Sequence, residues 1–184
     1  MTTCCIAPFF TKHFPAPVAT IGVGLFDVIP EVNQLSLAAI EGLDAAEAWA
    51  FGSRLNIVCG PSGSGKTRVL EALKQRTGTV AATLPPPEPR DFDGMSFGQT
   101  VMGLGKILLD IQPERTCLLM DDVLGNLDRE NTEHLIHLLQ THGKQVILTV
   151  KPHQLDVVRT GTDGMPVRFF HLALPVGGGH AAEA

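Results

Sequence analysis

The stretch GPSGSGKT, residues Gly60 to Thr67, decides how the rest of the chain is interpreted. Its spacing, a glycine, four residues and then Gly65-Lys66-Thr67, is that of a phosphate-binding P-loop. Glycines let such a loop wind around a phosphate with its N–H groups pointing inward, and a helix that starts there adds the positive end of its dipole. We therefore expect phosphate contacts from the residues of this loop and its first helical turn: Gly60, Pro61, Ser62, Gly63, Ser64, Gly65, Lys66, Thr67 and Arg68.

The residues on either side of the loop place it between a strand and a helix. RLNIVC, residues 54–59, is typical of a buried strand, and TRVLEALKQRTG, residues 67–78, is a helical pattern closed by a glycine. In a P-loop the lysine, here Lys66, reaches the β- and γ-phosphates, and the hydroxyl of Thr67 holds Mg²⁺. The sequence therefore predicts a nucleotide site in which Lys66 is a catalytic group.

Two carboxylates follow a second apolar run. TCLLMDD places Asp121 and Asp122 directly after a predicted strand, residues 116–120. We expect this strand to lie beside the P-loop strand, where Mg²⁺ needs a second anchor, and we assign that role to Asp121. Asp122 is then placed to orient or deprotonate the attacking water.

The segment SFGQ, Ser96 to Gln99, opens a predicted helix. A serine at the N-cap with a glutamine three residues later is the pattern of a capping box, which is a purely structural role. The same helix N-terminus also offers Ser96 and backbone N–H groups to a phosphate. The two roles are compatible, and both remain open on the sequence.

From Arg54 onward the chain alternates predicted strands with predicted helices, which is typical of a parallel α/β sheet. Ahead of it, short β-prone runs in residues 18–40 predict an antiparallel strand pair, and LDAAEAWAF, residues 43–51, predicts a short helix. The expected fold is α/β: a P-loop NTPase with a mostly parallel sheet flanked by helices and an N-terminal antiparallel β element. Further strands are expected at 79–84, 116–120, 144–150 and 167–174, and further helices at 97–111 and 129–143.

Length and composition indicate one domain. The 184 residues suit a single core, placed at residues 18–174 between a flexible arm, 1–17, and a flexible Gly-rich tail, 175–184. No apolar run approaches the roughly 20 residues of a membrane helix and no secretory signal is recognisable, so we expect no membrane insertion. Cys59 and Cys117 fall in predicted core strands as inert apolar residues, and we expect a reduced, cytoplasmic setting.

Three segments together carry a resemblance to a known group. RLNIVCGPSGSGKTRVLEAL, MSFGQ and CLLMDDVLGNLD, in that order, resemble the ATPase heads of the ABC superfamily, and in motif style the RecF/SMC-type branch. The resemblance implies ATP and Mg²⁺ as cofactors and a nucleotide-dependent homodimer. In such a dimer Ser96, Gly98 and Gln99 of one subunit cap the ATP held by the P-loop of the other, and Asp128 is the acid of the D-loop.

The resemblance also bears on the partners. It implies that opening and closing of the dimer drives or gates an unidentified protein partner, and it suggests a role in DNA maintenance. The net charge of −5, however, gives no general electrostatic reason to bind nucleic acid.

The chain departs from this group in two places. Only 96 − 66 = 30 positions separate Lys66 from Ser96, where relatives carry a helical lobe or a coiled coil, and the loss of that lobe argues against transport. The predicted strand at 144–150 is followed by Lys151-Pro152-His153, where many relatives have a histidine at once. We expect His153 to serve as the switch residue, with contact between Lys151 and the γ-phosphate as the alternative.

Two other functions remain open on the sequence. A small P-loop kinase that phosphorylates a metabolite fits the length. Such a kinase brings arginines over the phosphates on a lid, and the only candidate lid, the Pro-rich connector PPPEPRDFDG at residues 85–94, offers only Arg90. A non-hydrolytic, ATP-dependent interaction module is the other, because Asp122 is one methylene shorter than the glutamate of many hydrolytic relatives.

Overall fold

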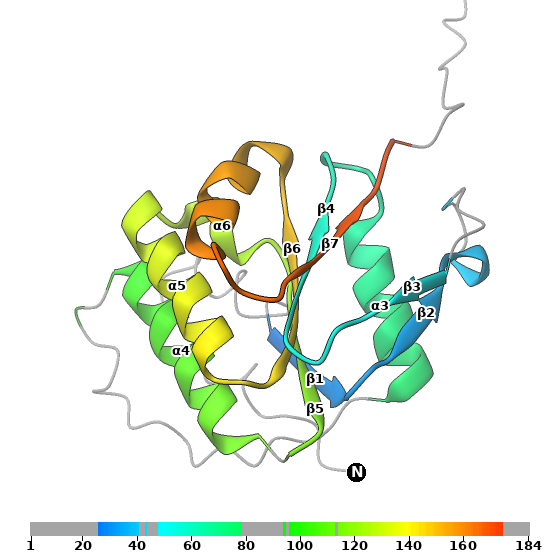
Figure 1. Ribbon diagram of the computed structural model, residues 1–184, viewed down its shortest axis with the longest axis horizontal. Helices are drawn as coiled ribbons and strands as arrows, with labels where there is room; N and C mark the ends of the chain where they lie inside the picture. The colour runs from blue at the N-terminus through cyan, green and yellow to red at the C-terminus, as the bar shows by residue number, and fades with distance from the viewer. Residues whose placement is uncertain are drawn as a thin grey trace, which may run out of the picture.

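The computed structural model describes residues 26–40, 43, 48–78, 94, 96–112 and 114–174. Its elements form three layers around a central sheet, with helices α4, α5 and α6 on one face and helix α3 and a small second sheet on the other (Figure 1). Each layer buries the apolar face of its neighbour, as an α/β domain requires.

The central sheet has five strands in the spatial order β1-β5-β6-β4-β7. Strand β1 is antiparallel to β5, whereas β5, β6, β4 and β7 are parallel to one another. This arrangement confirms the predicted α/β class with a mostly parallel sheet. The strands span Phe26–Pro30 (β1), Leu55–Cys59 (β4), Thr116–Met120 (β5), Gln145–Val150 (β6) and Arg168–His171 (β7).

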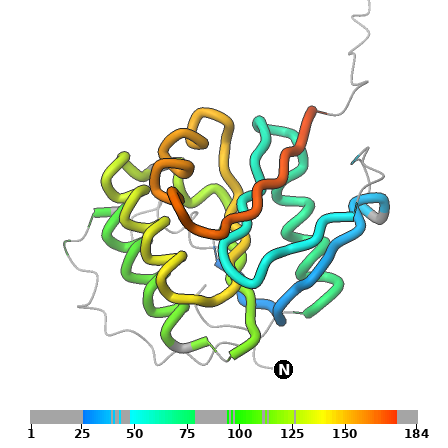
Figure 2. Tube along the Cα trace, in the orientation of Figure 1, coloured from blue at the N-terminus to red at the C-terminus, as the bar shows by residue number. Residues whose placement is uncertain are grey.

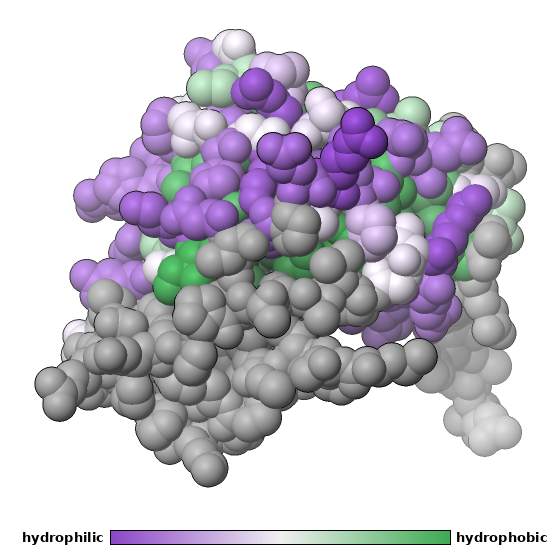
Figure 3. Space-filling model, turned by 90° about the horizontal axis from the view of Figure 1, so that it is seen from below, coloured by the Kyte–Doolittle hydropathy of each residue, from purple (hydrophilic) through white to green (hydrophobic). Residues whose placement is uncertain are grey.

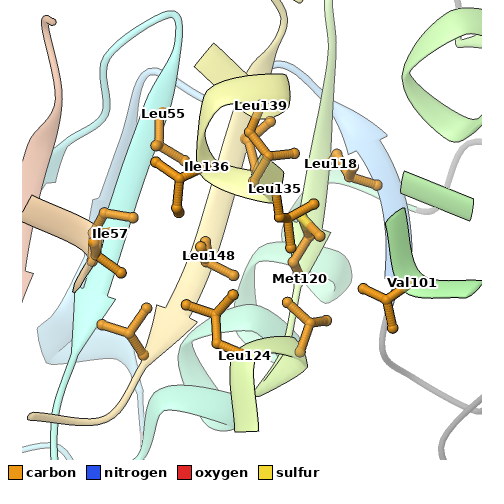
Figure 4. Close-up of a cluster of buried hydrophobic side chains, with 14 of the residues drawn as sticks. Leu55, Ile57, Val101, Leu118, Met120, Leu124, Leu135, Ile136, Leu139 and Leu148 are labelled. Atoms are coloured by element: carbon orange, nitrogen blue, oxygen red, sulfur yellow. The ribbon is translucent and has the colours of Figure 1, made fainter. Parts of the chain in front are cut away.

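Strands β4, β5 and β6 are buried along their whole length, which explains their unbroken apolar sequences. Side chains alternate between the two faces: in β5, Leu118 and Met120 join the core under α4–α6, and Cys117 and Leu119 join the core under α3. Figure 4 shows the first of these cores, in which Leu135, Ile136 and Leu139 of α5 lie over Leu118, Met120 and Leu148 of the sheet.

Helices α3, α4 and α5 lie close to their predicted positions, whereas α6 was not predicted. Helix α3 covers Lys66–Thr77 and ends at Gly78, whose φ of 77° suits a glycine. Helix α4 covers Phe97–Ile111, and α5 covers Arg129–Thr141. The remaining helical elements are short: η1 (Leu37–Ala39), η3 (Val123–Asn126), η4 (Pro152–Gln154) and α6 (Leu155–Gly161).

The N-terminal antiparallel element exists, but its pairing differs from the prediction. Strand β1 pairs with β5, while β2 (Gln34–Ser36) pairs with β3 (Ala48–Ala50) in a separate two-stranded sheet. The predicted helix at 43–51 is wrong at its end, because β3 occupies residues 48–50. Trp49 is 6% exposed and stacks on Phe170 with ring centroids 4.7 Å apart. Burial of that indole ring overrides the helix propensity of the surrounding alanines.

Several predicted segments lie outside the described residues. They are the arm at 1–17, the strand at 79–84 with the proline-rich connector after it, and the tail at 175–184. The described chain ends just past β7, which runs beside β4 (Figure 2). No helix in the described ranges is long and apolar enough to cross a membrane.

The surface of the described residues is mostly hydrophilic. In the view from below, hydrophilic side chains cover most of what can be seen of them, with smaller hydrophobic areas between (Figure 3). Met165 and Leu174 are the large hydrophobic side chains exposed within the described ranges. Single exposed apolar residues of this kind are normal for a globular surface.

The two described cysteines are expected to resist thiol reagents. Burial raises the pKa of the Cys59 thiol, although Lys66 and Arg159 lower it to a smaller extent, and burial likewise raises the pKa of Cys117. Since the thiolate is the reactive form, neither thiol should react at pH 8 in the folded protein. A Cys4→Ser/Cys5→Ser variant, titrated with Ellman's reagent before and after denaturation, isolates these two thiols. Rapid labelling of the folded variant would contradict their burial.

Candidate nucleotide-binding site

The P-loop connects β4 to α3 at the upper edge of the sheet in Figure 1. Gly63 and Gly65 have φ angles of 81° and 93°, which L side chains rarely adopt. A Cβ atom at Gly60 would overlap the hydroxyl of Ser64 and come within 2.8 Å of the carbonyl oxygen of Leu172. The glycines therefore serve the backbone path of the loop, as the sequence motif predicts.

One polar group inside the loop has no hydrogen-bond partner in the structure. The hydroxyl of Ser64 is buried, with the residue 1% exposed, and it makes no hydrogen bond with any described group. A buried hydroxyl without a partner costs free energy. A phosphate oxygen in the loop would satisfy it.

The side chain of Lys66 folds back over the loop. Its ammonium donates to the carbonyl oxygens of Gly60 at 2.7 Å and Pro61 at 2.9 Å, and the residue is 9% exposed. These are neutral acceptors, and an anionic phosphate forms stronger bonds with an ammonium. The ammonium thus lies at the loop, where a bound phosphate would accept hydrogen bonds from it.

Asp121, which follows β5, forms a hydrogen bond with Thr67 in the first turn of α3. The hydroxyl of Thr67 donates to Oδ2 of Asp121 at 2.7 Å, although 54 positions separate the two residues. A hydroxyl and a carboxylate are the hard oxygen ligands that Mg²⁺ prefers, so both predicted magnesium ligands fit the ion.

The strand that carries Asp121 does not lie beside the P-loop strand, contrary to the sequence prediction. Strand β6 runs between β5 and β4, so the prediction of direct neighbours is wrong. Propensity and periodicity do not encode strand order, which depends on how the crossover helices pack.

The intervening strand supplies Thr149, a residue that the sequence analysis missed. Its hydroxyl donates to Oδ1 of Asp121 at 2.6 Å and accepts from the backbone N–H of Asp122 at 2.8 Å. One hydroxyl therefore fixes both acidic positions. The available signal was a single polar residue in the otherwise apolar run VILTV.

Asp122 has an unusual backbone and a charged partner. Its φ of 48° lies in the left-handed region, which aspartate tolerates better than most residues. Its Oδ2 accepts from the ammonium of Lys151 at 2.7 Å, and its side chain is 47% exposed. The carboxylate thus faces solvent with a cation beside it.

The structure brings Lys151, not His153, to the predicted water-activating carboxylate. His153 lies in η4 with its side chain exposed, and no hydrogen bond or ion pair joins it to any described residue. Lys151 is fixed from its backbone, because its N–H donates to Oε1 of the buried Gln154 at 2.7 Å.

The predicted capping box at Ser96 is confirmed. Oγ of Ser96 accepts from the N–H of Gln99 at 3.3 Å, and Oε1 of Gln99 accepts from the N–H of Ser96 at 2.9 Å. Both side chains are exposed, so this helix N-terminus faces solvent.

The helix after Ser96 packs closely against the segment that carries Asp128. A Cβ atom at Gly98 would come within 3.1 Å of Asn131 and 3.3 Å of Leu127. Asp128 caps helix α5, with Oδ1 accepting from the N–H of Asn131 at 2.8 Å and Oδ2 from its side-chain amide at 2.9 Å. The two segments that resemble the signature and the D-loop are therefore neighbours.

The last predicted phosphate contact, Arg68, lies on the exposed side of α3 just after Thr67. Groups of three or more acidic, histidine or cysteine side chains able to hold a metal ion do not occur in the described ranges. The magnesium set is accordingly one carboxylate and one hydroxyl, which leaves room for phosphate and water oxygens around the ion.

The comparison with solved structures supports the fold described above. No family model matches the chain, and no curated protein matches it. Among solved structures it is similar to the SMC head domain from Thermotoga maritima, with a TM-score of 0.50 and 13% identity over 77% of this chain and 94% of that one. At this identity the likeness shows the fold alone. The chain thus has an α/β fold similar to that of an SMC head domain.

Proposed function

We propose that the chain binds ATP with Mg²⁺ and hydrolyses ATP to ADP and phosphate. The observation that carries this proposal is the 2.7 Å contact between the hydroxyl of Thr67 and the carboxylate of Asp121, at the end of a loop with the glycine geometry of a phosphate cradle. A P-loop kinase would share this contact, but no described feature indicates a second substrate.

Each group in the site has a task toward the nucleotide. The loop N–H groups, the hydroxyl of Ser64 and the ammonium of Lys66 bind the phosphates, while Thr67 and Asp121 hold the metal. When bound, Mg²⁺ supplies positive charge against the phosphate oxygens. Thr149 keeps Asp121 oriented for that task.

Asp122 is the proposed general base. In hydrolysis, the oxygen of water bonds to the γ-phosphorus, the bond from that phosphorus to the ADP oxygen breaks, and Asp122 accepts a proton from the water. The hydrogen bond from its N–H to Thr149 holds the start of η3, and its side chain remains half-exposed.

We further propose that the protein works as a nucleotide-gated homodimer. Ser96, Gly98 and Gln99 lie at a solvent-facing helix N-terminus next to Asp128, and such an end attracts phosphate. Two copies joined head to tail would place this end over the nucleotide of the other copy. Closure and opening would then move or gate a protein partner.

A nucleic-acid partner has less support. The net charge of −5 provides no general attraction to the phosphate backbone. A role in DNA maintenance rests on the RecF/SMC-type resemblance alone.

One observation favours slow turnover, and with it the ATP-dependent interaction module as a second candidate. The ammonium of Lys151 occupies Oδ2 of Asp122, the proposed base, at 2.7 Å, and water activation by Asp122 requires this ion pair to open. Nucleotide binding with negligible phosphate release would support this candidate over a working ATPase.

Thermal melting with and without magnesium tests nucleotide binding. ATP at about 100 times its dissociation constant should add about 2.7 kcal/mol to the free energy of unfolding. We expect most of this gain to need Mg²⁺ and to be lost in excess EDTA. Thr67→Val should remove the magnesium dependence, whereas Thr160→Val, on the exposed surface of α6, should keep it. Equal melting temperatures with and without ATP would contradict the proposal.

A further inference from the structure

We propose that Lys151 is the residue by which this protein distinguishes ATP from ADP. In the structure its ammonium is bound to Asp122, and a terminal phosphate of the nucleotide competes for that ammonium and leaves the carboxylate free. The inference rests on the proposed nucleotide site and adds a residue that recognises the γ-phosphate.

The position of Lys151 on the sheet carries the first part of the inference. Val146, Leu148 and Val150 of β6 belong to the core under α4–α6, whereas Ile147 belongs to the core under α3. Strict alternation places Thr149 and then Lys151 on the α3 side. That is the side on which the helix of the P-loop lies.

The backbone around Lys151 adjoins the P-loop itself. Cys59 and Val150 are register partners in parallel strands, and the N–H of Gly60 donates to the carbonyl oxygen of Val150 at 3.2 Å. The residues that follow the two strands, Gly60 and Lys151, are therefore neighbours. Lys151 thus lies beside Gly60, the first residue of the P-loop.

The side-chain contacts carry the second part. The ammonium of Lys66 donates to loop carbonyls, and the ammonium of Lys151 donates to Asp122. Two ammonium groups therefore lie at the proposed phosphate site. Lys66 belongs to the loop that holds any nucleotide, whereas the ammonium of Lys151 bonds, among the described residues, to Asp122, the carboxylate assigned to the water that attacks the γ-phosphate. Its side chain is 29% exposed, so it can change partner without leaving a buried charge unpaired.

The exchange has a consequence for Asp122. In the structure the ammonium of Lys151 occupies Oδ2 of Asp122, at 2.7 Å, where a water molecule would otherwise bind. Once a terminal phosphate takes the ammonium, Asp122 is available to the water. Recognition of the terminal phosphate and access of water to the carboxylate of Asp122 are then a single event.

Calorimetric binding of ADP and of the non-hydrolysable analogue AMP-PCP, both with Mg²⁺, tests the inference. Lys151→Met should weaken AMP-PCP binding about tenfold, as expected for loss of a charge-assisted bond that replaces an existing ion pair, and should leave ADP binding unchanged. Lys151→Arg should restore most of the preference. Lys74→Met is the matched control, because Lys74 pairs with Asp27 at 2.9 Å with a similar 30% exposure and lies on the far part of α3.

A double variant separates direct contact from simple repulsion. In Lys151→Met the unpaired charge of Asp122 alone could repel a γ-phosphate. Lys151→Met/Asp122→Asn removes both charges and keeps the net charge of the pair at zero. If Lys151 binds the phosphate, the analogue preference stays lost in the double variant; if the preference returns, the inference is overturned.

The remaining outcomes are equally decisive. Unchanged discrimination in Lys151→Met, or equal affinity of the wild type for ADP and AMP-PCP, would overturn the role of Lys151 and leave the nucleotide site intact. A wild-type protein that binds neither nucleotide would overturn the proposed function and this inference with it.

Discussion

Replacement of Lys66 by alanine is expected to lower ATP affinity by more than about 100-fold. Hydrogen bonds between charged groups contribute about 1.5–3 kcal/mol each, and the ammonium is expected to contact two phosphates. Among the described residues the ammonium of Lys66 bonds to two loop carbonyls, both neutral acceptors, so the melting temperature without ATP should change little. Calorimetric titration of ATP with Mg²⁺ into both proteins measures the effect.

Lys74→Ala provides the control for loss of a lysine from the same helix. Lys74 bonds to Asp27 rather than to the loop, so its loss should leave ATP affinity unchanged. If Lys66→Ala binds ATP as tightly as the wild type, the phosphates do not lie in this loop and the proposed site is incorrect.

Asp122→Asn is expected to reduce hydrolysis by at least about 100-fold while ATP still binds, since general base catalysis contributes that much or more. An amide has the same shape but cannot accept the proton from water. Asparagine also tolerates the left-handed backbone found at this position, where φ is 48°. The bond between Thr67 and Asp121 does not involve this side chain, so magnesium binding should persist.

Single-turnover release of phosphate measures this effect. The exposed Asp163→Asn, in the turn after α6, loses an equal charge away from the site and should hydrolyse ATP at the wild-type rate. Wild-type phosphate release from Asp122→Asn would assign water activation to another group, and His153 would be the next residue to replace.

Local features of the fold and site were predictable from the sequence because short-range rules determine them. The glycines of the P-loop, the capping box at Ser96 and the apolar strand before Asp121 each depend on a few adjacent residues. The structure places all of these where the pattern indicates. The structure also brings the two predicted magnesium ligands, Thr67 and Asp121, into contact.

Features that depend on tertiary packing were not predictable. Nothing in the local pattern places β6 between β4 and β5, so the contacts of Thr149 with both acidic positions could not be foreseen. The pair between Lys151 and Asp122 likewise joins residues 29 positions apart. The sequence pointed to His153 by its resemblance to the ABC-type heads, whereas the structure places Lys151 against Asp122.

The misplaced strand β3 illustrates the same limit. LDAAEAWAF has the alanine content of a helix, but Trp49 needs a partner for its large apolar surface and finds it on Phe51 and Phe170. Only the folded chain supplies Phe170, which lies 121 positions after Trp49 (170 − 49). Gly98 of α4 likewise permits a close approach to Leu127 and Asn131 that only the folded chain supplies.

Light scattering of Asp122→Asn with and without ATP and Mg²⁺ tests the nucleotide-gated dimer most directly. Bound ATP would add charge-assisted bonds to both subunits at once, so the variant should be monomeric alone and dimeric with ATP. Ser96→Arg should prevent dimerisation by placing bulk against the partner's nucleotide, yet leave ATP binding to the monomer. A protein that stays monomeric with ATP and hydrolyses it at a rate per molecule independent of protein concentration would contradict the account.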